Sequence, residues 1–377
     1  MHYDHLVIGA GMSGISAASE LALHSTTLLL ETETAPGYHS TGRSAALFTP
    51  NFGSPVVRAL NRAGHAFFAR PAPAFTDAPL LQPRGALTIA APGEEALIDE
   101  LILSASSEHP IRAVSPAQAL TRAPLLRTEG VAAAAFEPGV MDIDVSALQQ
   151  GFLRQFRARG GTLVPGCNVE RLVPDATGWW VSCATRTFTA GVVVNAAGAW
   201  AGEVATLAGI DSPELTPRRR TAIVVDVPAG LAVANLPVVD FAGSAAYFKP
   251  DAGRLMASLG DETPDRPHDV QPDDYDVAVL VDWLERQTTL EVQGVDSSWA
   301  GLRTFVADQA PVVGFDDRAP GFFWLAAQGG YGIMMAPALA RLTAGLVSGE
   351  GVPADLSADG VTQASLAPGR AGLALRP

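Results

Sequence analysis

The stretch that decides the fold is Leu6-Val-Ile-Gly9-Ala-Gly11-Met-Ser-Gly14, close to the N-terminus. Its apolar first residues predict a buried parallel strand, and its glycines follow the spacing GxGxxG. The first glycine permits a tight turn, the second lets a pyrophosphate approach the backbone, and the third allows close helix–strand packing. Apolar residues recur at helical spacing over 12–23, and residues 27–30 predict a second strand. The chain is therefore predicted to begin with a βαβ unit that binds a dinucleotide.

Glu31 follows the second predicted strand, 22 residues after Gly9. An acidic side chain at this place accepts hydrogen bonds from ribose hydroxyls, and it disfavours the 2′-phosphate of NADP. Glycine-rich sequences also occur in ordinary turns. A strand, a helix and an acidic residue at these positions favour a dinucleotide site over a plain turn, because the helix N-terminus adds partial positive charge for the pyrophosphate.

Further pieces of the same domain are scattered along the chain. Residues 161–164 and 191–195 form apolar runs, and residues 169–189 alternate like a β-meander. Residues 321–327 precede a glycine-rich segment and an apolar helix over 334–346. We therefore predict an α/β fold with α+β insertions, in which a Rossmann-like cofactor-binding domain of residues 1–49, 144–213 and 311–377 is joined to a β-sheet-rich substrate-binding domain of residues 50–143 and 214–310.

The composition argues against several classes of function. The 377 residues carry a formal net charge of −14, which disfavours binding to nucleic acid or to anionic membranes. No apolar stretch reaches the about 18 residues that a membrane span needs, and the N-terminus lacks the pattern of a signal peptide. Cys167 and Cys183 show no CxxC spacing. We expect a cytoplasmic protein with two reduced thiols, without a disulfide and without a zinc or other metal site.

Three longer segments resemble the D-amino acid oxidase superfamily of flavoproteins: Pro36–Ala46, Trp299–Asp308 and Ala326–Ile333, supported by Val194–Trp200. The resemblance covers nearly the whole chain and is greatest to the branch that includes D-arginine dehydrogenase. It implies non-covalently bound FAD and oxidative deamination of a D-amino acid. A hydride would pass from Cα to flavin N5, and water would hydrolyse the imino acid to a 2-keto acid and ammonia.

The resemblance also implies which residues contact FAD. Most belong to the glycine turns, to the loop after Glu31 or to the C-terminal motif: Gly9, Gly11, Met12, Ser13, Gly14, Glu31, Thr41, Gly42, Arg43, Ser44, Ala45, Ala46, Val169, Ala197, Gly198, Trp200, Arg303, Gly329, Gly330, Tyr331, Gly332 and Ile333. His39 lies in the same loop, and we expect it to form hydrogen bonds there in preference to a covalent bond with the flavin.

Four residues are implied to bind the substrate. Arg220 and Arg303 match positions that bind its carboxylate, Tyr247 matches a tyrosine that donates to the same group, and the Gly330 carbonyl matches one that holds the amine. A planar guanidinium binds a carboxylate in two-pronged fashion, which gives this assignment a physical basis. The alternative for each arginine is a surface ion pair, which is the ordinary role of arginine.

The chain departs from D-arginine dehydrogenase where that enzyme binds the substrate side chain. Ala86 stands at the position of a glutamate, and Leu47 and Phe52 replace a histidine and a tyrosine, whereas Thr49 is kept. A buried cation without a carboxylate partner costs several kcal/mol, so D-arginine is disfavoured. We expect a pocket for neutral or apolar D-amino acids, lined by Leu47, Phe48, Thr49, Phe52 and Ala86.

Other functions remain open at this point. The electron acceptor is a quinone, oxygen or another carrier. An oxidase of glycine, sarcosine or another secondary amine, producing hydrogen peroxide, is the main alternative. A catalytically inactive flavin subunit and an NAD-dependent dehydrogenase are less favoured, because the chain keeps Arg303, Tyr247 and Gly330 together with the C-terminal motif.

Overall fold

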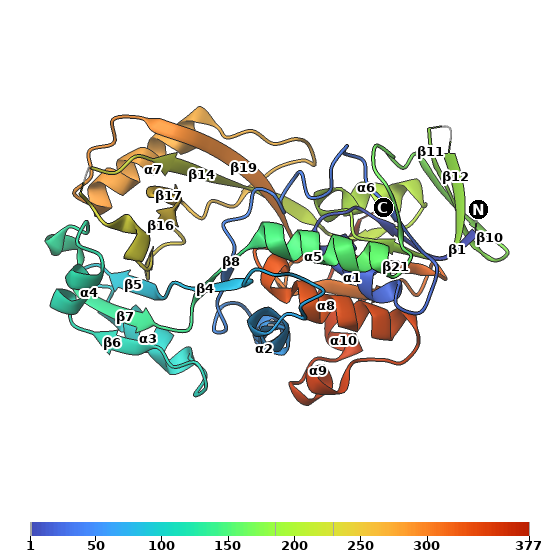
Figure 1. The fold of residues 1–377 in the computed structure, drawn as a ribbon, viewed down its shortest axis with the longest axis horizontal. Coiled ribbons are helices and arrows are strands. Elements are labelled where there is room, and N and C mark those ends of the chain that lie inside the picture. The colour runs from blue at the N-terminus through green and yellow to red at the C-terminus, as the bar shows by residue number, and fades with distance from the viewer. Residues whose placement is uncertain (1, 185, 229, 377) are drawn as a thin grey trace.

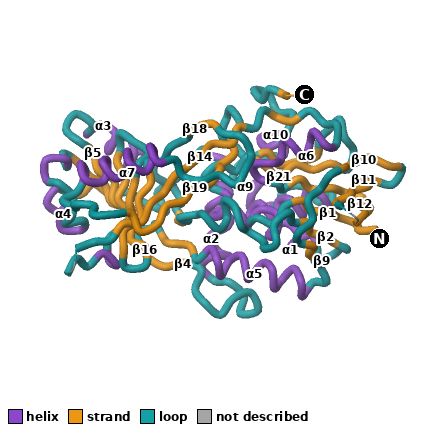
Figure 2. The backbone as a smooth tube through the Cα atoms, turned by 90° about the horizontal axis from the view of Figure 1, so that it is seen from above, coloured by secondary structure: helices purple, strands orange, loops and turns teal. Residues whose placement is uncertain are grey.

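The computed structural model describes residues 2–184, 186–228 and 230–376. Its elements group around two large sheets, which lie toward opposite ends of an elongated molecule (Figures 1 and 2). This arrangement confirms the predicted mixed α/β fold, with a Rossmann-like part and a second, sheet-rich part. The N-terminus and C-terminus both lie at the end that holds the first sheet.

The first sheet has eight strands among the described residues. Its parallel part runs in the order β9 (Thr162–Val164), β2 (Thr27–Leu30), β1 (His2–Ile8), β12 (Arg186–Asn195) and β21 (Phe322–Ala326). Antiparallel strands extend it: β11 (Gly178–Cys183) beside β12, β10 (Arg171–Asp175) beside β11, and β20 (Val312–Phe315) beside β21. The GxGxxG turn leaves β1 at the centre of this sheet.

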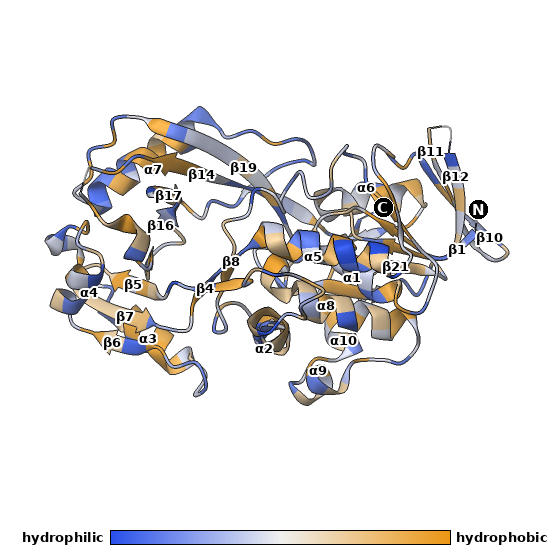
Figure 3. Ribbon diagram, viewed as in Figure 1, coloured by the Kyte–Doolittle hydropathy of each residue, from blue (hydrophilic) through white to orange (hydrophobic). Residues whose placement is uncertain are grey.

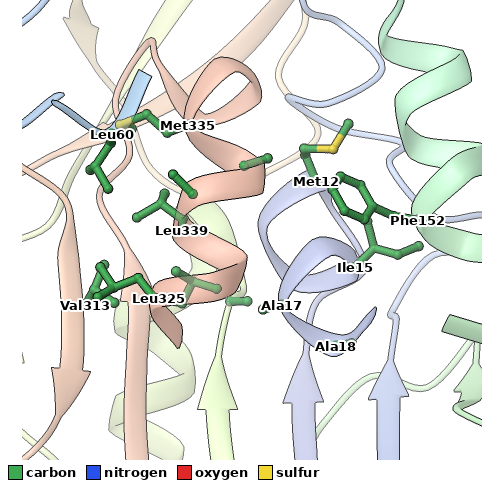
Figure 4. Close-up of a cluster of buried hydrophobic side chains, with 14 of the residues drawn as sticks. Met12, Ile15, Ala17, Ala18, Leu60, Phe152, Val313, Leu325, Met335 and Leu339 are labelled. Atoms are coloured by element: carbon green, nitrogen blue, oxygen red, sulfur yellow. The ribbon is translucent and has the colours of Figure 1, made fainter. Parts of the chain in front are cut away.

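Both faces of the parallel part are buried, as parallel strands require. On one face lie the helices α1 (Met12–Leu21), α2 (Pro55–Ala69), α5 (Val145–Ala158) and α8 (Gly332–Val347) (Figure 1). Figure 4 shows their shared core, where Met12 and Ile15 of α1 lie near Phe152 of α5. On the other face lie the β10–β11 meander and α6 (Ala201–Leu207). At the end of β1, Leu6 and Ile8 belong to the second core and Val7 to the first, as the alternation of side chains along a strand requires.

The second sheet has nine strands in the described ranges. Its order is β18 (Thr263–Pro264), β14 (Thr216–Val225), β17 (Arg254–Ser258), β16 (Tyr247–Asp251), β15 (Val238–Phe241), β5 (Ala86–Ala90), β7 (Ala133–Glu137) and β6 (Arg112–Val114), with β19 (Val295–Phe305) along β14. The helices α3 (Glu95–Ser104), α4 (Pro116–Arg122) and α7 (Asp274–Gln287) belong to this half. Apolar residues are concentrated along β5 and β7 (Figure 3), where one face packs into a core with α7.

Smaller elements complete the chain. A three-stranded sheet joins β3 (Leu47–Phe48), β8 (Met141–Ile143) and β4 (Leu81–Pro83). Near the C-terminus, α9 (Ala354–Ala358) and α10 (Gln363–Leu366) precede β22 (Leu375–Arg376), which pairs with β13 (Ser212–Pro213). Three 3-10 turns cover Thr128–Gly130, Gly198–Trp200 and Val233–Asn235.

Cys167 and Cys183 form a disulfide, so the expectation of two reduced thiols is wrong. Their Cα atoms lie 5.5 Å apart, because the loop after β9 passes the end of β11. This proximity comes from the folding of the meander, and the spacing of the two cysteines in the sequence does not reveal it. Both cysteines are buried, as expected for Cys167.

The predicted domain boundaries follow the sheets closely, with one helix that spans the division. All strands of the second sheet lie between residues 50 and 143 or between 214 and 310, within the ranges predicted for the substrate-binding domain. Helix α2 falls in the same predicted range but packs against α8 of the first half. The boundaries themselves stay a prediction. No helix in the described part of the chain is long and apolar enough to span a membrane.

Candidate active site

A cavity of about 960 Å³ is bordered by residues of both halves of the molecule. The part of the molecule that is built around the first sheet contributes the GxGxxG turn, the loop after β2, residues 167–170, residues 196–200 and the turn between β21 and α8. The part that is built around the second sheet contributes residues of β14, β16, β17 and β19. The cavity thus reaches from the carboxyl ends of parallel strands, where α/β folds bind cofactors, to the second sheet.

The first and third glycines of the GxGxxG turn leave no room for a side chain. Gly9 adopts a φ of +98°, and a Cβ there would lie 2.7 Å from the Ala196 carbonyl oxygen. A Cβ on Gly14 would lie 1.8 Å from the Gly9 oxygen, so α1 approaches the turn as closely as its backbone allows. Gly11 lies on the cavity itself. This is the geometry in which a pyrophosphate meets backbone N–H groups at a helix N-terminus.

Glu31 is held rigidly at the end of β2. One carboxylate oxygen accepts a hydrogen bond from the Ala10 N–H at 2.8 Å, and the other accepts from the Glu33 N–H at 3.0 Å. The side chain borders the cavity together with Thr32 and Glu33. Carboxylate lone pairs that remain free point to recognition of ribose hydroxyls, as the sequence predicts.

The loop over residues 37–45 forms hydrogen bonds with elements of both parts of the molecule. Thr41 accepts a hydrogen bond from the Met12 N–H at 2.9 Å, and Trp299 donates to the Arg43 carbonyl at 3.0 Å. Arg43 donates to two backbone carbonyls, Val270 at 2.9 Å and Ala300 at 3.0 Å, and pairs with Asp269. The loop therefore ties the glycine turn of the first sheet to β19 of the second.

His39 takes part in these contacts as a hydrogen-bonding residue. Its Nε2 lies 3.0 Å from a Glu33 carboxylate oxygen. Its ring packs on Trp200, with 4.5 Å between the ring centroids. His39 and Trp200 both border the cavity.

The C-terminal glycine motif closes the cavity beside Arg303. The Gly329 N–H donates to the Thr304 carbonyl at 2.9 Å, and a Cβ on Gly329 would lie 2.6 Å from the Phe305 ring. A Cβ on Gly330 would lie 2.8 Å from an Arg303 guanidinium nitrogen. Gly329, which adopts a φ of +53°, needs glycine because β19 passes directly against the turn that starts α8, whereas a side chain on Gly330 would displace the Arg303 guanidinium.

The residues present fit FAD. A glycine turn at a helix N-terminus matches the pyrophosphate of a dinucleotide, and a fixed carboxylate at the end of β2 matches its ribose; both border the same cavity. Most of the predicted cofactor residues border the cavity: Gly9, Gly11, Met12, Ser13, Glu31, Thr41, Arg43, Ser44, Ala45, Val169, Ala197, Gly198, Trp200, Arg303, Gly329, Gly330, Gly332 and Ile333. Four others, Gly14, Gly42, Ala46 and Tyr331, are not among its lining residues.

Arg220, Tyr247 and Arg303 meet at the end of the cavity that faces the second sheet. They come from three strands, β14, β16 and β19, and Ala222, Met256 and Ser258 line the wall beside them. The sequence gives no motif for these last three residues. The feature of the sequence that could have indicated them is the alternation of side chains along β14 and β17, because every second side chain of a strand points to the same face.

The two arginines differ in their partners. Arg220 donates to the Asp261 carbonyl at 3.1 Å and lies 3.3 Å from a Glu262 oxygen. Burial, with the neighbouring charge of Arg303, lowers the pKa of Arg220 to about 10. Among the described residues, no carboxylate lies within ion-pair distance of Arg303. A half-buried guanidinium without an acidic partner, beside a second one, forms a site for an anion.

The predicted side-chain pocket does not border this cavity. Phe48 is 1% exposed and packs against Phe68 in the core, and Thr49 donates to the Met334 sulfur. Leu47 and Ala86 belong to a small apolar cluster that packs against Tyr247, so they reach the cavity wall only through that side chain. Phe52 is 59% exposed and lies against Tyr331. The end of the cavity that faces the second sheet is lined by the strand residues named above.

Comparisons with known proteins identify the family of the chain. The model of the DAO family, FAD dependent oxidoreductase, matches residues 4–346. Glycine oxidase of Geobacillus kaustophilus is 25% identical over 67% of this chain and 66% of its own length. The FAD-dependent oxidoreductase domain-containing protein 1 of Mus musculus is 26% identical over 72% of this chain and 64% of its own length. The matched part thus spans slightly less than two thirds of these relatives.

Solved structures share the fold. The crystal structure of the glycine oxidase from Geobacillus kaustophilus superposes with a TM-score of 0.84 at 23% identity, covering 98% of this chain and 99% of that one. An L-α-glycerophosphate oxidase from Mycoplasma pneumoniae, solved with FAD bound, gives a TM-score of 0.82 at 18% identity, covering 92% and 95%. The chain belongs to the DAO family of FAD-dependent oxidoreductases, and FAD is its cofactor.

Proposed function

We propose that the chain oxidises the carbon–nitrogen bond of a small, neutral amino acid. The observation that carries this proposal is Arg303, an arginine that lines the cavity beside Arg220 and Tyr247 and has no carboxylate within ion-pair distance in the described part of the chain. A carboxylate on the substrate supplies the missing anion, because a guanidinium binds it with two parallel hydrogen bonds. Tyr247 adds a phenol donor, and the Gly330 carbonyl accepts from the amine.

These groups fix the orientation of the substrate. With the carboxylate on Arg303 and the amine on Gly330, Cα is held between them and the rotation of the substrate is restricted. Bound FAD would supply the acceptor for the hydride that leaves Cα. The amine donates to the Gly330 carbonyl in its neutral form, and the oxidised product is an imine that water hydrolyses to a 2-oxo acid and an amine or ammonia. We propose that FAD is held non-covalently by the contacts described above.

Two substrate classes satisfy this geometry. Similarity to D-arginine dehydrogenase favours D-amino acids with neutral side chains. A second candidate, glycine or N-methylglycine (sarcosine), is favoured by a specific observation: the residues predicted to line a side-chain pocket lie outside the cavity. Glycine oxidase among the relatives supports the same candidate. Both classes share the carboxylate and the amine that Arg303 and Gly330 would hold.

The test is a substrate panel with the purified, FAD-loaded protein. Glycine, sarcosine, D-alanine, L-alanine and D-arginine are compared by kcat/KM, and the 2-oxo acid, ammonia and methylamine are measured as products. We expect glycine, sarcosine or D-alanine to exceed L-alanine and D-arginine. D-arginine as the best substrate would contradict the neutral-substrate proposal. Turnover of none of these compounds would contradict the proposed reaction.

The same panel identifies the electron acceptor. Hydrogen peroxide in a yield equal to that of the 2-oxo acid indicates that oxygen is the acceptor. Turnover only with an added quinone indicates a dehydrogenase.

A further inference from the structure

Three arginines project from one face of the second sheet beside the cavity. β14 and β19 pair antiparallel, with Arg218 opposite Arg303 and Arg220 opposite Gly301. Opposite residues and residues two apart share a face of a sheet, so the side chains of Arg218, Arg220 and Arg303 lie together. Arg219 projects from the other face, where Asp276 lies 2.9 Å away.

Glu262 is the carboxylate that meets these arginines. β18 pairs with β14 so that Thr263 is opposite Arg219, which places Glu262 beside Arg220. One Glu262 oxygen lies 3.3 Å from Arg220 Nη2, and the other pairs with Arg218. The Glu262 side chain is 38% exposed. One negative charge is therefore shared by two of the three guanidinium groups, and Arg303 is left without a carboxylate among the described residues.

We propose that Glu262 determines the charge of the substrate, by favouring one carboxylate over two. This inference rests on the proposed function, in which the substrate carboxylate binds Arg303. A second carboxylate on the substrate would have to bind Arg220, where Glu262 already lies. The second carboxylate would meet a like charge there, or would have to displace Glu262 from both arginines. Specificity against it thus comes from a repulsive group held beside the site, because Glu262 does not itself border the cavity but contacts Arg220, which does.

Lys and His side chains do not offer the second carboxylate another place at this end. The cavity lining contains His39 and His268, but neither lies on the strands that carry Arg220, Tyr247 and Arg303. Arg43, the remaining basic residue of the lining, is paired with Asp269. Removal of the Glu262 charge would leave Arg220 available to a second carboxylate.

The proposal is tested by binding without turnover. FAD-loaded protein is titrated with acetate, which has one carboxylate, and with malonate, which has two, and the absorbance of the bound flavin is followed. We expect the wild-type protein to bind acetate more tightly than malonate. In Glu262→Gln the affinity for malonate should rise about tenfold, which corresponds to about 1.4 kcal/mol, while that for acetate changes less than about threefold.

Three variants make the result specific. Glu262→Asp keeps the charge and should preserve the wild-type preference. Asp276→Asn removes the partner of Arg219 on the other face and should also preserve it. Glu262→Ala serves as a second neutral variant. In Glu262→Gln and Glu262→Ala, the kcat/KM for D-aspartate divided by that for D-alanine should rise together with the affinity for malonate.

Two outcomes are distinguishable. If the wild-type protein binds acetate but Glu262→Gln and Glu262→Ala leave the malonate-to-acetate ratio unchanged, the role of Glu262 is overturned and the proposed function stands. If the wild-type protein binds neither carboxylate, the proposed function and this inference are both overturned.

Discussion

At the scale of single residues, Arg303 is the group on which the proposed chemistry depends. Arg303→Gln keeps a planar amide but removes the charge and the two-pronged donor pair. Because the substrate carboxylate then loses its main partner, kcat/KM should fall about 100-fold to 1,000-fold, mostly through a higher KM. Steady-state kinetics with the best substrate of the panel measure the change.

Two matched arginine variants complete this test. Arg303→Lys restores the charge without the fork geometry, so it should recover part of the loss. Arg219→Gln, on the opposite face and bound to Asp276, should leave KM within about threefold of the wild-type value. An unchanged KM in Arg303→Gln would show that the carboxylate binds elsewhere.

At the scale of elements, strands β7 and β15 carry two half-buried acids, Glu137 and Asp240. Burial raises the pKa of Glu137 to about 7, against a hydrogen bond from Asn51 that lowers it. Burial also raises the pKa of Asp240, to about 6. The folded protein therefore binds protons that the unfolded chain releases near pH 4. The stability that these groups contribute is fully present below about pH 4 and is lost as the pH rises through about 6 to 7.

Glu137→Gln should reduce this pH dependence. At pH 8 the variant should have a free energy of unfolding about 1 to 3 kcal/mol higher than the wild-type protein, because it buries no carboxylate that must ionise. The difference should shrink toward pH 4. Urea unfolding at pH 4 to 8 measures it, with Glu100→Gln on the exposed side of α3 as the control. If the free energy of unfolding depends on pH in the same way in the wild-type protein and in Glu137→Gln, the raised pKa of Glu137 is contradicted.

The disulfide joins the loop after β9 to the end of β11, at the cofactor cavity. Cys167 borders the cavity, and its N–H donates to the Glu31 carbonyl at 2.8 Å. Bridging residues 16 apart should stabilise the fold by about 2 to 4 kcal/mol. Loss of the bridge should also weaken FAD binding, because the loop that carries Asn168 and Val169 is released.

Thermal unfolding with and without a reductant measures this effect, together with FAD titration of the apoprotein. The double variant Cys167→Ala, Cys183→Ala should match the reduced wild-type protein and should not respond to the reductant. If the wild-type protein keeps its Tm and its FAD affinity under reduction, the bridge has no such role.

The elements near the glycine turn were predictable because their signals are local. Gly9, Gly14 and Glu31 act through spacing within one βαβ unit, so the sequence alone indicates their places. Glu262 meets Arg220 only through the register of β18 on β14, and Cys167 meets Cys183 only through the folded meander. Such contacts depend on pairing between distant segments, which no local pattern specifies. The same reason explains why Phe48 was expected in a pocket and lies in the core.

At the scale of the whole molecule, the cavity is formed by both halves of the chain. The first sheet supplies the glycine turn and Glu31, the second supplies Arg220, Tyr247 and Arg303, and the loop around Arg43 connects them. A cofactor bound at one end and a substrate at the other would meet between the two sheets. The central claim is that these two sites serve one redox reaction.

The measurement that tests this claim most directly is anaerobic reduction of the bound FAD by substrate. Glycine, sarcosine and D-alanine are mixed with the protein without oxygen, and the absorbance of oxidised flavin is recorded for the wild-type protein and Arg303→Gln. The account predicts loss of that absorbance with at least one of the three in the wild-type protein, and a rate at least about 100-fold lower in the variant at low substrate concentration. Flavin that stays oxidised with all three, or equal rates in both proteins, would contradict it.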